Sequence, residues 1–124
     1  MAKYLGLDVG EKRVGLALAD MDSGVAVPYG VYEREADFWG RLEALCRKEA
    51  VERVVVGWPV GMSGQKSQQT LAVEDFITEL KERLPEMAVE TVDERMTSKA
   101  TGLGQNNDAQ AAALILNNYL ERQT

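Results

Sequence analysis

Two apolar runs decide the fold, and they lie in residues 3–19, which read KYLGLDV, GEK, RVGLALA. Each run has seven residues and is rich in Leu, Val and Ala, as strands buried in a sheet are. The GEK spacer at residues 10–12 supplies a glycine that suits a short turn. The stretch therefore predicts a hairpin of two strands, residues 3–9 and 13–19. A third strand over residues 25–32 would complete an antiparallel meander.

The rest of the chain alternates between helical and strand patterns. Apolar residues recur at helical spacing in residues 37–50, 66–84 and 107–122, with Asp37 as the expected N-cap of the first helix and Pro85 ending the second. The run Val54-Val55-Val56 in residues 53–57 is typical of a parallel strand covered on both faces, and residues 87–92 predict a fifth strand. This order indicates an α/β fold: a mixed sheet, made of the three-strand meander and two parallel strands, with helices packed on it.

Length and composition set the broad class. The chain has 124 residues, of which 45% are hydrophobic and 27% charged, so we expect residues 1–124 to fold as one globular domain. No apolar run approaches the roughly 18 residues that a membrane helix needs, and no signal-peptide core follows the N-terminus. The sequence therefore predicts a cytoplasmic protein without membrane contact.

The residue types present narrow the chemistry. The chain contains no histidine, which excludes Ser-His-Asp and Cys-His catalysis and most structural zinc sites. Its single cysteine, Cys46, lies in a helical pattern and is expected to be a buried thiol. Carboxylate chemistry remains, or metal chemistry with oxygen ligands. The net charge of -6 argues against nucleic-acid binding through a broad basic surface.

Four acidic residues occupy positions that call for an explanation. Asp8 lies inside an apolar strand, where a charge is costly unless it is paired or bound to metal. Asp93 and Glu94 end a parallel strand, and Asp108 opens the last helix. Taken singly, Asp108 is explained as a helix cap and the Asp93-Glu94 pair as a solvated strand end. Taken together, acids at these places predict an oxygen cluster suited to Mg²⁺ or Mn²⁺.

Cations and a glycine-rich loop are candidates for contacts with phosphate. Residues 57–64 contain three glycines after the buried strand, and their backbone N–H groups suit a phosphate. A plain turn with Trp58 packed as a lid on the sheet edge explains the loop equally well. The candidate phosphate-binding side chains are Lys12, Arg13, Lys66, Arg95 and Lys99, with solvated surface cations as the alternative.

Four motifs, in order, resemble the YqgF/RuvX family. They read LGLDVG with KRVGLA at residues 5–10 and 12–17, VVGWP at 55–59, DERMTS at 93–98 and DAQAA at 108–112. That family is described as Holliday junction resolvases and as pre-16S ribosomal RNA nucleases, and it has the ribonuclease H-like fold, whose element order matches the one predicted above. The resemblance covers essentially the whole chain.

The resemblance implies a site and a reaction. Asp8, Glu94 and Asp108 would be the catalytic acids and the metal ligands, with Asp93 a neighbour, and two Mg²⁺ or Mn²⁺ ions would assist phosphodiester hydrolysis. The implied substrate is structured RNA, with 5′-end maturation of pre-16S rRNA as the first interpretation and branched DNA in recombination and repair as the alternative. A non-catalytic nucleotide-binding or partner-binding module is the third interpretation. An actin-like ATPase of that kind encloses its nucleotide between two domains, and this chain supplies one.

One segment departs from the family pattern. Residues 100–107 are short and contain no cation, whereas family members usually have a longer and often basic segment there. Weak phosphate neutralisation predicts a shallow salt dependence of nucleic-acid binding. Substrate shape, a second copy of the chain in a homodimer, or the ribosome would then have to supply the missing specificity.

Overall fold

The computed structural model describes residues 2–59, 64–93 and 108–122. In this part of the chain the strands are β1 (Lys3–Val9), β2 (Arg13–Asp20), β3 (Val25–Glu33), β4 (Val51–Trp58) and β5 (Ala88–Asp93). The helices are α1 (Phe38–Lys48), α2 (Gln68–Arg83) and α3 (Asp108–Arg122). Among these described helices, none has the length and apolarity needed to cross a membrane.

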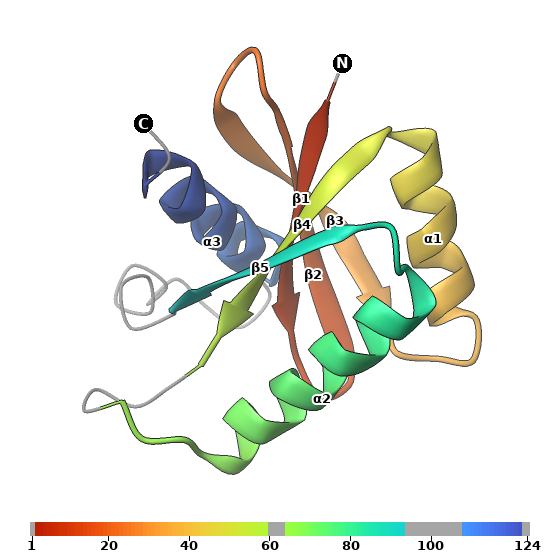
Figure 1. The fold of residues 1–124 in the computed structure, drawn as a ribbon, viewed down its shortest axis with the longest axis vertical. Coiled ribbons are helices and arrows are strands. Elements are labelled where there is room, and N and C mark those ends of the chain that lie inside the picture. Colours follow the sequence, from red (N-terminus) through yellow and green to blue (C-terminus); the bar gives the residue numbers. More distant parts are fainter. Residues whose placement is uncertain (1, 60–63, 94–107, 123–124) are drawn as a thin grey trace.

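The strands form one mixed sheet in the order β3-β2-β1-β4-β5 (Figure 1). β1 pairs antiparallel with β2, and β2 pairs antiparallel with β3, which is the predicted meander. β4 and β5 are parallel to β1 and are reached through α1 and α2. The predicted α/β class and the predicted division into a meander and two parallel strands are both confirmed.

The two faces of the sheet carry different side chains because neighbouring residues of a strand point to opposite sides. Leu5 and Leu7 of β1 point to the face covered by α1 and α2 and join the larger core cluster there. Gly6 and Asp8 of the same strand point to the face covered by α3. On that face the core contains five alanines, Ala17, Ala19, Ala26, Ala112 and Ala113, together with the larger residues Val55, Val92, Ile115, Leu116, Tyr119 and Leu120.

Helix α3 lies so close to the sheet that two strand positions have no room for a side chain. A Cβ atom on Gly6 would be 2.8 Å from the Leu116 Cβ and 2.9 Å from the Ala112 carbonyl oxygen. A Cβ atom on Gly15 would be 2.1 Å from the Asp108 carbonyl oxygen. Glycine at both positions therefore allows the first turn and the middle of α3 to touch the sheet.

The ends of several elements differ from the sequence-based expectation. Helix α1 ends at Lys48, before the expected end at residue 50, because Ala50 has a φ of 54° and leaves the helical region. β4 begins at Val51 and ends at Trp58, so it is longer than the predicted residues 53–57. β2 and β3 each extend one residue past the expected end, and β5 is shifted by one.

The helix caps follow local hydrogen bonding. Asp37 occupies the N-cap position of α1, as predicted, but its side chain makes no capping hydrogen bond. Helix α2 begins after Ser67, whose hydroxyl accepts a hydrogen bond from the Thr70 backbone N–H, so the expected start at residue 66 was two residues early. The helix ends just before Pro85, as predicted, because proline cannot continue the backbone hydrogen-bond pattern.

Candidate active site

The site is built where α3 begins above the hairpin of β1 and β2. Asp8 of β1 pairs directly with Gly15 of β2. The backbone of Asp108, the first residue of α3, lies over Gly15. Two acids from opposite ends of the sequence are thereby brought to one end of the α3 face of the sheet.

Asp8 is a half-buried carboxylate that has no cationic partner within the described ranges of the chain. Burial, and to a lesser extent the neighbouring Asp108 carboxylate, raise the pKa of Asp8 from 3.8 to about 6. No hydrogen bond or ion pair joins its carboxylate to another residue in the described part of the chain. Such an environment disfavours the negative charge and therefore favours binding of a positive ion.

Asp108, in contrast, has a cationic partner. The Arg13 Nε donates a hydrogen bond to the Asp108 Oδ2 over 3.2 Å, across 95 positions of sequence. The Asp108 carboxylate also lies in the first turn of α3, where the helix dipole favours negative charge. Asp108 is thus the first residue of its helix and also the ion-pair partner of an arginine on β2.

A small pocket opens beside this ion pair. It has a volume of about 290 Å³ and is lined by Gly10, Glu11, Lys12, Arg13 and Asp108. Two of the five predicted phosphate-binding cations, Lys12 and Arg13, are therefore at the site. The hairpin that carries them is closed by a hydrogen bond of 2.8 Å from the Gly10 N–H to the Arg13 carbonyl oxygen.

Lys66 lies in a different environment, so the structure does not place it with Lys12 and Arg13. Its Nζ is 3.0 Å from the Glu74 Oε2, and the Trp58 indole N–H donates to the same carboxylate oxygen over 3.0 Å. Glu74 belongs to α2, so Trp58 packs against that helix. Of the two interpretations of residues 57–64, the described part fits the packed tryptophan, and residues 60–63 lie outside it.

Of the remaining predicted site residues, the structure describes only Asp93. Glu94, Arg95, Lys99 and the cation-free segment 100–107 lie outside the described residues. Asp93 pairs with Trp58 across β5 and β4, whereas Val92 belongs to the α3 face. Strand alternation therefore directs Asp93 to the α2 side, away from Asp8. Within the described residues no group of three or more acidic or thiol side chains could hold a metal ion.

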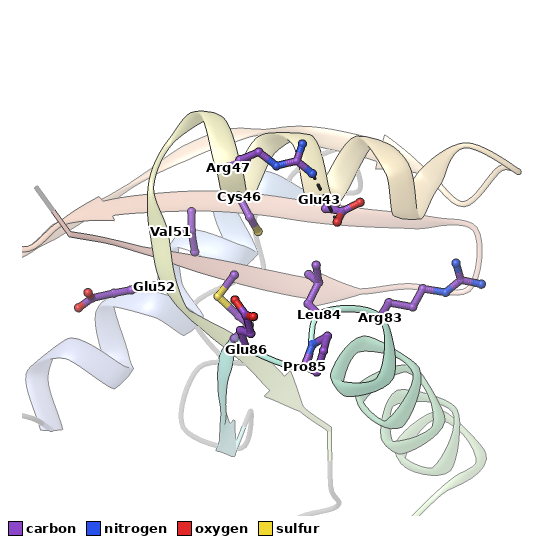
Figure 2. A pocket seen from close by; sticks show the side chains of 10 residues that line it. Glu43, Cys46, Arg47, Val51, Glu52, Arg83, Leu84, Pro85 and Glu86 are labelled. Carbon is purple, nitrogen blue, oxygen red and sulfur yellow. Dashed lines mark ion pairs between the residues drawn. The ribbon is translucent and has the colours of Figure 1, made fainter.

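A larger pocket, of about 570 Å³, lies at the other end of the parallel strands (Figure 2). Its lining includes the buried Cys46 and the first residue of β4, Val51, with Leu84 and Pro85 at the end of α2. Val51 pairs with the first residue of β1, whereas Asp8 is near the end of that strand, about 16 Å further along it. Burial raises the pKa of Cys46 to about 11, which disfavours the reactive thiolate form at neutral pH.

Sequence reasoning did not single out two residues that shape the site. Gly15 allows Asp108 to approach Asp8, and the signal for it was the run of small residues on one face of β2. Arg34 braces the hairpin: its backbone N–H donates to the Lys12 carbonyl oxygen over 2.8 Å and its Nη1 donates to the Gly10 carbonyl oxygen over 3.0 Å. No local sequence pattern predicts hydrogen bonds such as those from Arg34 to the backbone of the hairpin.

A family model and the relatives with similar sequences relate this chain to one family of nucleases. A family model described as "RuvX: Holliday junction resolvase" matches residues 2–122. A Corynebacterium jeikeium protein named "Putative pre-16S rRNA nuclease" is 42% identical over 100 residues, which is 79% of this chain and 64% of that protein. A protein of the same name from Flavobacterium psychrophilum is 34% identical and the match covers 99% of both chains.

The fold is also similar to that of a solved resolvase. The structure of T. thermophilus RuvC in complex with a Holliday junction substrate superposes with a TM-score of 0.62, over 99% of this chain and 96% of that one. The sequence identity is 14%, so this likeness concerns the fold alone. The mixed sheet is of the ribonuclease H-like type, as the order of its elements predicted.

Proposed function

This chain belongs to the RuvX family, and on that premise we propose that it is a nuclease that hydrolyses phosphodiester bonds of structured nucleic acid with the help of divalent cations. The first substrate we propose is precursor 16S rRNA, because relatives that match this chain are named for it. We further propose that the chain acts at the 5′ end of this RNA and in the cytoplasm. Branched DNA is the second, because the family model carries the description of a Holliday junction resolvase.

One observation carries the metal-dependent part of the proposal: the half-buried Asp8 carboxylate lies beside Asp108 and has no cationic partner among the residues that the structure describes. Bringing two carboxylates together is unfavourable unless a positive charge is bound between or beside them. Their oxygen atoms are the donors that Mg²⁺ and Mn²⁺ prefer. The residues present therefore fit a hard divalent cation, and the pKa of Asp8, raised to about 6, still leaves this carboxylate mostly ionised at neutral pH.

The roles follow from these positions. Asp8 and Asp108, with Glu94 contributed by the segment after β5, would hold two divalent cations. Such cations lower the pKa of an attacking water and stabilise the charge that develops on the leaving oxygen. Lys12 and Arg13 line the adjoining pocket and would bind phosphate oxygens, joined by Arg95 and Lys99. We assign Lys66 no primary role, because Glu74 already neutralises it.

Binding of the isolated chain should be weak. The net charge is -6 and residues 100–107 contain no cation, so few phosphates can be neutralised. Recognition would then depend on the shape of a structured substrate. A second copy of this chain, or the ribosome, would supply the further contacts.

The decisive experiment compares the purified protein with its Asp8→Asn variant. Both are incubated with labelled precursor 16S rRNA and with a labelled four-way DNA junction, in Mg²⁺ and in Mn²⁺. We expect the wild type to cleave one of the two substrates and Asp8→Asn to cleave at least about 10³-fold more slowly, because metal ions contribute several kcal/mol to such reactions.

The outcomes separate the alternatives. Faster cleavage of the RNA supports the rRNA nuclease, and faster cleavage of the junction supports the resolvase. Equal rates for wild type and Asp8→Asn, with host nucleases removed, would show that Asp8 is not a metal ligand. Absence of cleavage of both substrates under all conditions would favour a non-catalytic binding module.

A further inference from the structure

Arg13 and Asp8 approach Asp108 from two directions. Arg13 and Gly15 are two residues apart on β2, so they share the α3 face, and Gly15 pairs with Asp8 on the neighbouring strand. Asp108 lies over Gly15 and contacts Arg13 through its Oδ2. Of these two carboxylates, only that of Asp108 is paired with Arg13 in the described part of the chain.

The geometry points to a competition: we propose that Arg13 and a divalent cation exclude one another at the Asp108 carboxylate, so that cation binding releases the Arg13 guanidinium to hold a substrate phosphate. This inference rests on the proposed function, because it takes Asp108 to be a metal ligand. It adds an order of events to that function: the protein binds the metal first, and the phosphate-binding arginine becomes available only then.

The ion pair has the properties of a contact that is easily exchanged. The Arg13 side chain is 51% exposed and that of Asp108 is 30% exposed. Pairs this exposed contribute little to stability, because water competes for both charges. A divalent cation offers the carboxylate a larger charge and thus a stronger interaction. Replacing the arginine at Asp108 therefore requires little free energy.

The released arginine would already lie in the correct place. The Arg13 backbone stays fixed by the hydrogen bond from Gly10, while its long side chain can turn into the pocket beside Lys12. A guanidinium binds phosphate oxygens through two parallel hydrogen bonds, which an ammonium group cannot do. Release from Asp108 therefore converts a group that neutralises a carboxylate into one that recognises nucleic acid.

Lys12 provides a matched control within the same pocket. It carries the same charge as Arg13 and lines the same cavity, but no ion pair joins it to Asp108 among the described residues. Removing either charge changes the electrostatic potential of the pocket in the same direction. Only removal of Arg13 also frees the Asp108 oxygen.

The first measurement is a calorimetric titration with Mn²⁺ in the absence of nucleic acid, on the wild type and on Arg13→Gln, Lys12→Gln and Asp108→Asn. We expect Arg13→Gln to bind Mn²⁺ about two- to fivefold more tightly than the wild type, which is the factor that corresponds to losing one exposed competing ion pair. Lys12→Gln should bind Mn²⁺ with an affinity clearly closer to that of the wild type.

The second measurement is nucleic-acid affinity across a salt series, with Ca²⁺ present or with EDTA, on whichever of the two substrates the wild type cleaves faster. With Ca²⁺ we expect Arg13→Gln to lower the slope of log affinity against log salt by about 0.7 to 0.9, the loss of one phosphate contact. With EDTA the same substitution should leave the slope unchanged, because Asp108 already holds the arginine.

The results distinguish this inference from the proposed function. Tighter Mn²⁺ binding by Arg13→Gln alone, together with a change of slope only in Ca²⁺, supports the competition. Equal Mn²⁺ affinities in Arg13→Gln and wild type, or an equal gain in Lys12→Gln, would overturn it while leaving the metal site intact. If Asp108→Asn binds Mn²⁺ as well as the wild type does, the metal assignment of the proposed function fails.

Discussion

The middle parts of β1 and β2 present leucine and valine to the α1/α2 face of the sheet, called the large face, and glycine and alanine to the α3 face, called the small face. Leu5, Leu7 and Val56 point to the first face, where they meet Phe76 and other large residues of the helices. On the second face β1 presents Gly6 and β2 presents Gly15 and Ala17, so α3 packs directly against the backbones of these two strands. On the large face, bulky side chains fill the gap between the sheet and the helices α1 and α2. On the small face, α3 lies directly on the strand backbones, so no such gap exists there.

The large face contributes mainly to the stability of the fold, and the small face contributes mainly to the arrangement of the candidate site. Burial of large apolar side chains supplies most of the favourable free energy of folding, and it occurs mainly beneath α1 and α2. Close approach of α3 supplies proximity, because only a helix that touches Gly15 can bring Asp108 beside Asp8. The following predictions test whether the two faces can be perturbed independently, beginning with the largest expected effect.

Substitution of the glycine beneath α3 should damage both fold and activity. In Gly15→Ala the new Cβ would be 2.1 Å from a backbone oxygen of Asp108, so α3 has to move outward. We expect a loss of about 3 kcal/mol in the free energy of unfolding and a loss of cleavage by the molecules that remain folded. Urea unfolding and activity per folded molecule measure the two effects.

Two controls sharpen this test. Gly40→Ala places a methyl group in open space on α1, where alanine favours the helix by about 0.5 to 1 kcal/mol, so the protein should become slightly more stable. Leu42→Ala empties a fully buried position on the large face and should cost about 2 to 5 kcal/mol without changing cleavage by folded molecules. If Leu42→Ala and Gly15→Ala reduce specific activity equally, the proposed separation of the faces is wrong.

Divalent cations that bind at the candidate site on the small face should stabilise the folded protein. A cation that binds the folded site and not the unfolded chain raises the free energy of unfolding by about 2.7 kcal/mol at a hundredfold excess over its Kd. Thermal unfolding in EDTA and in Mn²⁺ measures this shift. Neutralising Glu94 or Asp108 should reduce the shift, and an unchanged shift in both variants would place the cation elsewhere.

The carboxylate pair should make stability depend on pH in a predictable direction. The pKa of Asp8 is raised from 3.8 to about 6 in the folded protein, so the folded state binds the proton more tightly than the unfolded chain does. The free energy of unfolding should therefore fall as the pH rises from about 4 to about 7, by about 1 to 3 kcal/mol. Repulsion between clustered carboxylates has the same sign.

Asp8→Asn isolates this contribution. In EDTA at pH 7 the variant should be more stable than the wild type, and the difference should shrink as the pH falls and disappear at about pH 3 and below, where folded and unfolded chains are both largely protonated at Asp8. Urea unfolding across this pH range provides the measurement. A difference that stays constant with pH would show that Asp8 ionises in the folded protein as it does in the unfolded chain.

The smallest expected effect concerns the cation-free segment. Replacing Gln105 and Asn106 by lysine should tighten nucleic-acid binding and steepen the salt slope by up to about 1.4 to 1.8, if both new charges reach phosphates. The double variant Glu52→Gln and Glu86→Gln changes the net charge equally at the far pocket and serves as the control. Equal slopes in the two double variants would place residues 105 and 106 away from the substrate.

Local patterns in the sequence predicted the elements well because those patterns arise from local geometry. Two apolar runs joined by a short glycine-containing spacer identified β1 and β2, and helical spacing identified α1, α2 and α3. The predictions were wrong at the ends of the elements, because the conformation or hydrogen bonding of a single residue determines where a helix begins or ends. Ala50 ended α1 through its positive φ, and the Ser67 hydroxyl fixed the start of α2.

The candidate site was predictable in part. Asp8 was conspicuous because a charge inside an apolar strand is costly, and the structure gives it the expected half-buried position. Lys66 was chosen only as a cation near a glycine-rich loop, and its pairing with Glu74 could not be foreseen. Long flexible side chains choose partners from whatever the fold brings near, so spacing along the chain does not determine them.

By itself, the sequence determined the order of the elements, the two faces of β1 and the residue types available for chemistry. These properties follow from the short-range rules of strand and helix periodicity. Only the tertiary structure decided that Asp108 lies beside Asp8 and binds Arg13, a contact across 95 positions. That contact exists because α3 docks against Gly15, and the docking of a helix depends on packing of the whole face rather than on any local pattern.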